Sequence, residues 1–230
     1  MRLYNLLTKY PDDYMFNLLQ IDNFNKETSH LRYFYRHLIK NKNKIKGDIY
    51  EFGTYNGKTA LGIALLLKKL NLSMKVYCFD SFQGFPSYHK YDDFKYLNYN
   101  KKVMFKHNVN VKLRKFISNK KISIKNISSS SDFKKVKLNL LRKKIKLLKL
   151  NNIIIVKGSF EKTIPKFFKK KRKIFSVNMD CDLYNSYNVA LPYIYKNLSK
   201  GGFVHLDEYY SLKFPGAKLA CDKFIKKNKI

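Results

Sequence analysis

Five short apolar segments recur along the chain of 230 residues, and stretches with helical spacing separate them. The segments are "GDIYEFG", "KVYCFDSF", "NNIIIVKGSF", "KIFSVNMD" and "FVHLDEYY". Their β-branched and aromatic residues, bounded by Gly, Asp or Asn, are typical of strands. Strands that alternate with helices are joined by right-handed crossovers and share one parallel sheet. The sequence therefore predicts an α/β fold, a doubly wound parallel sheet with helices on both faces.

Residues 1–46 precede the first expected strand and are predicted to form an N-terminal helical cap. Leu31, Phe34, Tyr35 and Leu38 recur there at helical spacing. An apolar stripe of this kind is expected to pack on the domain that follows.

Residues 47–230 are predicted to form a single domain, since a chain of this length buries enough surface for one sizeable core. Residues 87–130 interrupt the pattern, because they are long, polar and tyrosine-rich and have no clear period. Loops of this length inside a compact domain are usually lids or disordered. We interpret the segment as an insertion that acts as a lid, whose tyrosines could cover a sugar or stack on RNA bases. These tyrosines are Tyr88, Tyr91, Tyr96 and Tyr99.

Three details of the expected elements follow from local sequence. A helix is predicted over residues 131–150, with Ser131 or Asp132 as its N-cap. The apolar run of the third strand suits a strand covered on both faces. The helix in "NSYNVALPYIYKNLSKGG" is expected to stop at Gly201 and Gly202, before the last strand.

The formal net charge of +32 permits attraction of polyanions such as nucleic acid. Only six of the 48 basic residues are Arg, although base recognition favours the planar guanidinium. We interpret most of the charge as solvated lysine surface, and nucleic acid stays an alternative partner.

Cys78, Cys181 and Cys221 are not clustered and show no C-x-x-C spacing, so neither a disulfide framework nor a zinc site is expected. No segment approaches the length of a membrane helix, and the first residues do not resemble a signal peptide. The sequence predicts a soluble cytoplasmic protein with reduced thiols and no membrane insertion. The sequence is also compatible with a homo-oligomer.

The candidate binding residues follow the expected strands, where doubly wound sheets bind ligands. After the first strand, Glu51, Gly53 and Gly57 form an E-x-G-x-x-x-G turn, in which small residues let the backbone approach a ligand. Glycines after strands are also common turn residues. Asp80 ends the second strand, where it can accept hydrogen bonds from both hydroxyls of a ribose or cap a helix. Together these residues favour a nucleoside-cofactor site.

Several motifs in order along residues 47–225 resemble the macrocin O-methyltransferase (TylF/MycF-like) family. They are "GDIYEFGTYNGKTA", "CFDSFQGFP", "VKGSFEKTIP", "MDCDLYNSYNVALPYIYKNLSKGGFVHLDEYY" and "FPGAKLACDKF". The resemblance implies a class I methyltransferase (Rossmann-like) fold that binds S-adenosylmethionine and a magnesium ion. It also implies methyl transfer to a hydroxyl, which belongs to a sugar in the best-known members. The acceptor is then a small molecule or glycan that bears hydroxyl groups.

The same resemblance assigns cofactor-binding residues by motif. Glu51, Gly53 and Gly57 would line the methionine end of the cofactor, and Asp80 with Ser81 would bind its ribose. The implied set is completed by Thr54, Tyr55, Gly158, Ser159 and Asp180.

Four acids follow the fourth and fifth strands. The resemblance places Mg²⁺ there, and carboxylates close together would otherwise repel or take up protons. Asp180, Asp207 and Glu208 are the expected ligands. Asp182 would be a further ligand or the base that takes the hydroxyl proton, and Asp180 would be the base if it is not committed to the metal. Without a metal, the acids would cap helices or pair with lysines.

Two features depart from the family pattern. Glu208 stands where the family usually has Asp. The sequence ends at Ile230, directly after the last expected helix, so we expect no C-terminal antiparallel hairpin. The alternatives to the sugar methyltransferase are a methyltransferase that acts on RNA and a non-catalytic protein that binds an anionic ligand on a methyltransferase-like fold.

Overall fold

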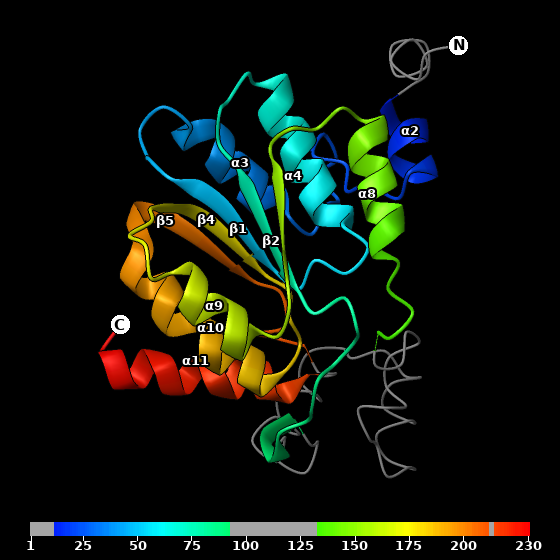
Figure 1. The fold of residues 1–230 in the computed structure, drawn as a ribbon. Coiled ribbons are helices and arrows are strands. Elements are labelled where there is room, and N and C mark those ends of the chain that lie inside the picture. Colours follow the sequence, from blue (N-terminus) through cyan, green and yellow to red (C-terminus); the bar gives the residue numbers. More distant parts are fainter. Residues whose placement is uncertain (1–11, 93–132, 212–213) are drawn as a thin grey trace.

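The computed structural model describes residues 12–92, 133–211 and 214–230 (Figure 1). Five strands form one sheet in the order β3-β2-β1-β4-β5, and all four pairings are parallel. The predicted parallel α/β sheet is therefore confirmed. The strands are β1 (Asp48–Phe52), β2 (Val76–Asp80), β3 (Ile153–Lys157), β4 (Ile174–Met179) and β5 (Leu198–Leu206).

Helices cover both faces of this sheet (Figure 1). Strand residues alternate between the two layers, as a period of two requires: Ile49 packs with the first helix set and Tyr50 with the second. The first set is α2 (Asp12–Leu18), α3 (Arg32–Asn41), α4 (Lys58–Lys69) and α8 (Leu138–Leu147). The second set is α9 (Phe160–Phe167), α10 (Tyr184–Asn197) and α11 (Pro215–Asn228). Within the described residues, no antiparallel hairpin follows α11.

The N-terminal segment packs against α4, and the predicted apolar stripe is buried. Leu31, Phe34 and Leu38 have no exposed surface. A buried polar group fixes the same segment, because Asp22 accepts hydrogen bonds from Ser29 Oγ and Tyr35 OH, both at 2.7 Å. The Asp22 N–H donates to the carbonyl of Lys58 at 3.0 Å, which ties the segment to the start of α4.

The third strand is not covered on both faces, contrary to the prediction. β3 lies at the edge of the sheet, and Ile154 is 37% exposed. The apolar run indicated burial, but burial depends on which elements cover a strand and not on its residues alone. The adjacent helix is also shorter than predicted: α8 begins at Leu138 after a turn in which Phe133 has a φ of +59°. Ser131 and Asp132 lie outside the described residues.

The last strand begins earlier than predicted. α10 ends at Asn197 and β5 starts at Leu198, so the glycine pair expected to stop the helix lies inside the strand. Leu198 pairs with Ile174 and Phe203 with Ser176, so β5 advances five residues while β4 advances two. The extra residues form a bulge, which glycine accommodates.

Most of the predicted lid, from residue 93 onward, lies outside the described residues, together with Tyr96 and Tyr99. Its first part contains η1 (Lys90–Asp92), whose buried Asp92 accepts the N–H of Tyr184 at 2.7 Å. The three cysteines are free and buried, as predicted. No described helix has the length and apolar character needed to cross a membrane.

The packing of the N-terminal segment on α4 leads to a prediction for Gly62. A Cβ there would lie 2.5 Å from the carbonyl oxygen of Asp22. Ala is normally preferred over Gly inside a helix, but we expect Gly62→Ala to lower the free energy of unfolding by about 1–3 kcal/mol, because backbone must move. Urea denaturation measures this change. Asn139→Ala, at an exposed site on α8, should stay within about 0.5 kcal/mol. Equal or higher stability of Gly62→Ala would contradict the packing.

Candidate functional site

A cavity of about 250 Å³ lies at the carboxyl ends of the strands. The hydrogen-bond ladder of the sheet continues there one residue past four of the five strands and fixes the walls of the cavity. The N–H groups of Gly53, Gly158, Asp180 and Asp207 each donate at 2.9 Å to a carbonyl at the end of the neighbouring strand. The first three of these residues line the cavity. The sheet itself therefore brings together the loops that the sequence singled out.

Gly53 provides the close approach on which the shape of the cavity depends. Its φ is +90°, and a Cβ at this position would overlap the carbonyl oxygen of Asp180. Only glycine avoids both the backbone strain and the overlap. The turn therefore lets the backbone at the end of β1 lie directly against the backbone at the end of β4.

Asp80 holds two turns together at the end of β2. Its two carboxylate oxygens accept the N–H of Tyr55 at 2.7 Å and the N–H of Phe82 at 2.6 Å. A carboxylate has about four lone-pair sites, so these two hydrogen bonds do not use its whole capacity as an acceptor. Burial raises the pKa of Asp80, and the backbone donors oppose that shift. Asp80 lines the cavity and is suited to accept hydrogen bonds from two vicinal hydroxyls.

Two predicted cofactor residues support the cavity from behind without lining it. Glu51 has no exposed surface and accepts hydrogen bonds from Thr59 Oγ1 and from Asn178 Nδ2. Burial raises the pKa of Glu51 to about 8. Gly57 has a φ of +76° and precedes α4, where a Cβ would overlap Leu141. The other predicted cofactor residues line the cavity: Gly53, Thr54, Tyr55, Asp80, Ser81, Gly158, Ser159 and Asp180.

The cavity also has an apolar wall that sequence reasoning missed in part. Phe133 packs against Phe85 and Tyr55, with ring centroids 5.0 and 5.2 Å apart. Such rings suit the faces of a planar base. Phe85 belongs to the quoted "CFDSFQGFP" motif, whereas Phe133 stood in the segment interpreted as a helix. No local signal identified Phe133, because it reaches the cavity only through the fold.

His30 brings the N-terminal segment to the cavity, and sequence reasoning did not select it either. Its Nδ1 lies 3.9 Å from the buried carboxylate of Asp22. The rings of His30 and His205 are 6.2 Å apart, and His205 Nε2 lies 3.4 Å from Asp207 Oδ1. This row of polar side chains connects the cavity to the acids after β5.

The three predicted metal ligands do come together. Asp180, Asp207 and Glu208 each offer a carboxylate oxygen, and these oxygens lie within 4.8 Å of one another. A set of three carboxylates is the kind of donor group that Mg²⁺ prefers. The donor chemistry and the spacing of these residues therefore fit a divalent cation.

The electrostatics of the three acids differ from one to the next. Burial, followed by the charge of Asp207, raises the pKa of Asp180 to about 7. Burial and the charges of Asp182 and Asp180 raise the pKa of Glu208 well above its usual range, and Tyr187 OH donates a hydrogen bond to this carboxyl. The hydrogen bond from His205 lowers the pKa of Asp207. Without a cation, protons offset much of the repulsion in this cluster.

Asp182 lies between the acid cluster and the cavity. It lines the cavity two residues after Asp180, in a left-handed conformation with a φ of +61°. The turn therefore directs both acids of the D-C-D sequence to the same region, with the intervening Cys181 buried.

The sequence of the chain matches the Macrocin-O-methyltransferase (TylF) family over residues 26–230, which is most of its length. The chain belongs to this family. Its members are S-adenosylmethionine-dependent enzymes, and the chain is an O-methyltransferase with the class I fold. No curated protein matches the sequence.

Solved structures similar to this O-methyltransferase support the fold. The O-methyltransferase NovP is 22% identical, with a TM-score of 0.60, and the match covers 85% of this chain and 69% of NovP. The calicheamicin methyltransferase CalS11 is 20% identical, with a TM-score of 0.63, and the match covers 97% of this chain and 82% of CalS11.

The buried carboxyl of Glu51 leads to a prediction for the pH dependence of stability. Its pKa is about 8 in the folded protein and near 4.5 in the unfolded chain. At a pH between these two pKa values, the unfolded state binds fewer protons than the folded state. The free energy of unfolding therefore falls as the pH rises, by up to about 1.4 kcal/mol per pH unit.

The substitution Glu51→Gln removes this titration but keeps the shape of the side chain. Relative to the variant, the parent enzyme should lose stability between pH 5 and pH 8. Urea denaturation of both proteins across this range measures the difference. Parallel curves would show that Glu51 does not take up a proton on folding.

Proposed function

We propose that this O-methyltransferase transfers a methyl group from S-adenosylmethionine to a hydroxyl of a sugar or glycan, with the assistance of Mg²⁺. The observation that carries the proposal is the position of Asp180 and Asp182, which line the same cavity as Asp80, while Asp180 is also one of the three clustered acids. One cavity therefore offers a place for a nucleoside cofactor and a place for a hydroxyl to lose its proton.

The cofactor would occupy the part of the cavity between the β1 and β2 turns. Asp80 would accept hydrogen bonds from the ribose hydroxyls, beside Ser81, and the rings of Phe85 and Phe133 would contact the adenine. Gly53, which lines the cavity and has no side chain, would present its backbone to the methionine end. Bound S-adenosylmethionine supplies a methyl group that its sulfonium has already activated.

The acceptor would lie between the cofactor and the acids. In the reaction, the acceptor oxygen would take the methyl group from the sulfonium, which would leave as a neutral thioether, and the hydroxyl proton would go to a base. Asp182 is our choice for the base, because Asp180 is one of the three acids that would hold the cation. A bound Mg²⁺ would lower the cost of deprotonation and orient vicinal hydroxyls.

The sugar class of the acceptor is supported by the structural neighbours. One CalS11 structure is described as a TDP-rhamnose 3'-O-methyltransferase, and the chain is 22% identical to it, with a TM-score of 0.51. The acids Asp180, Asp207 and Glu208 suit an acceptor with neighbouring hydroxyls, because a cation at this place can bind two oxygens at once.

Calorimetric titration with S-adenosylmethionine tests the cofactor site. The parent protein should bind, and Asp80→Asn should weaken binding by about 10- to 100-fold, because hydrogen bonds to a charged acceptor are lost. Asp48→Asn is the matched control: Asp48 also accepts a backbone N–H, from Lys75 at 2.8 Å, but at the opposite end of the sheet. No binding by the folded parent protein would exclude this cofactor. Equal losses in both variants would indicate a structural effect instead.

Thermal melting with and without Mg²⁺ tests the cation site. A ligand at 100 times its dissociation constant should raise the melting temperature by about 5–10 °C for a protein of this size. The triple substitution of Asp180→Asn, Asp207→Asn and Glu208→Gln should abolish the shift while keeping the shapes of the side chains. No shift in the parent protein would count against the cation. A shift of equal size in the triple variant would place the ion elsewhere.

A further inference from the structure

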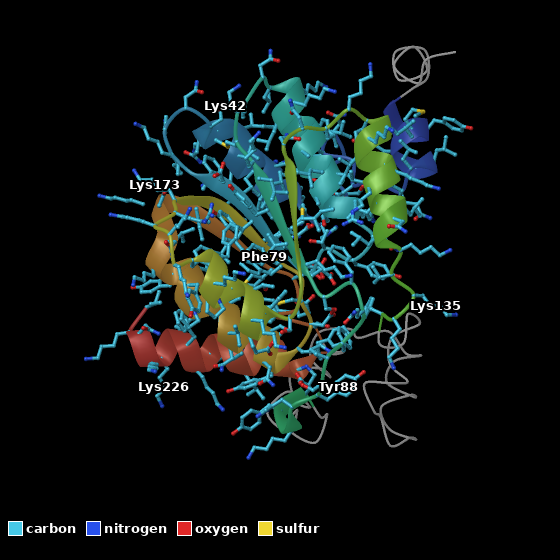
Figure 2. All side chains as sticks on the ribbon, viewed as in Figure 1. Lys42, Phe79, Tyr88, Lys135, Lys173 and Lys226 are labelled. Carbon is cyan, nitrogen blue, oxygen red and sulfur yellow. The ribbon has the colours of Figure 1, made fainter. Side chains whose placement is uncertain are left out.

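A second cavity, of about 730 Å³, lies at the opposite end of the sheet from the first cavity. The amino ends of three strands surround it. Lys46 lies two residues before β1, Lys173 directly precedes β4, and Leu198 begins β5. Figure 2 shows Lys173 at this end of the sheet, across the molecule from Lys135, which lies on the side of α8. We call this place the basic cavity.

The basic cavity is lined by eight cationic side chains and by no carboxylate. Four of them come from the loop between α9 and β4: Lys169, Lys171, Arg172 and Lys173. The other four come from the segment before β1 and from α10 and β5: Lys44, Lys46, Lys196 and Lys200. No carboxylate in the described part of the chain forms a salt bridge with any of the eight. Within the described residues, no carboxylate therefore offsets the repulsion among these cations.

Helix dipoles account for only part of this charge. Lys and Arg are favoured near helix C-termini, which explains Lys196 in the last turn of α10 and Lys169 just after α9. Lys46 and Lys173 precede strands, and Lys200 lies in the bulge of β5. These three lysines have no such structural reason to gather here.

The lining of the basic cavity also contains aromatic side chains. Phe168 and Tyr193 are half-buried, with ring centroids 5.8 Å apart, and both line the cavity. Arg172 is held in place, because its guanidinium lies 3.8 Å from the ring centroid of Phe167. Lysines and aromatic rings in one lining together match a ligand that has both phosphates and planar bases.

We propose that the basic cavity binds single-stranded nucleic acid. The phosphates contact the lysines that line the cavity, and an unpaired base packs on Tyr193, because Phe168 is already stacked on Tyr50 with ring centroids 5.7 Å apart. A duplex keeps its bases paired and stacked, so it offers only phosphates to this cavity. The bound strand is a partner and not the methyl acceptor, because the methyltransferase cavity lies at the carboxyl ends of the strands. The proposal therefore does not depend on the acceptor proposed above.

The first test measures the salt dependence of binding by fluorescence anisotropy. The full chain is titrated with a labelled oligouridylate of about 12 nucleotides, a length in the range of single-strand sites. The triple substitution of Lys169, Lys171 and Lys173 by Gln should make the negative slope of log association constant against log salt concentration shallower by about 2. It should also weaken binding about 100-fold at 0.1 M salt.

A matched triple substitution controls for overall charge. Lys143, Lys146 and Lys149 are exposed on α8 or at its end, so their replacement by Gln changes the net charge equally. This control should bind like the parent protein, and circular dichroism should show both triple variants folded. Equal losses in the two triple variants would overturn the proposal, because binding would then follow the diffuse charge of the chain.

The second test separates nucleic acid from other polyanions. An abasic oligomer of the same length has the same charge but no bases, so it should bind at least about fivefold more weakly than the oligouridylate. Tyr193→Leu should weaken binding of the oligouridylate and leave binding of the abasic oligomer unchanged. Equal binding of the two oligomers by the parent protein would overturn the assignment to nucleic acid and leave a general polyanion site.

Discussion

The parallel hydrogen-bond ladder is the interaction on which the rest of the structure depends. It continues past the strands into Gly53, Gly158, Asp180 and Asp207, each of which donates its N–H to the neighbouring strand. Loops from distant parts of the sequence are therefore fixed to one rigid edge, where small errors in position would be costly for methyl transfer. Gly53 makes this arrangement possible, because any side chain there would push the ends of β1 and β4 apart.

The acids at the carboxyl ends of the strands are buried, and burial raises the free energy of their charged forms. Asp180 and Glu208 have raised pKa values in a protein that otherwise has a large excess of lysine. Within residues 12–92, 133–211 and 214–230, the salt bridges of the cluster involve only His205. A cation and protons are therefore the two means by which this cluster can lower its repulsion.

The carboxyl and amino ends of the strands thus carry side chains of opposite charge. Strand ends at the carboxyl edge carry Asp80, Asp180 and Asp207, whereas the segments that enter β1 and β4 carry lysines. The chain is basic as a whole, but several of its few acids lie where the chemistry is proposed, and eight of its cations line the cavity where a polyanion is proposed to bind. A single value of net charge hides this division.

The sequence by itself determined the five strands, their parallel sense and the acids and glycines that follow them, because local apolar runs and turn residues decide those features. It also indicated the family and the three carboxylates that form the acid cluster. It could not determine that β3 lies at an edge or that β5 begins at Leu198, since both depend on which elements lie alongside a strand. Only the tertiary structure brought Phe133 and His30 to the cavity and gave Asp180 and Asp207 opposite pKa shifts, because contact and burial depend on distances in space that residue spacing along the chain does not fix.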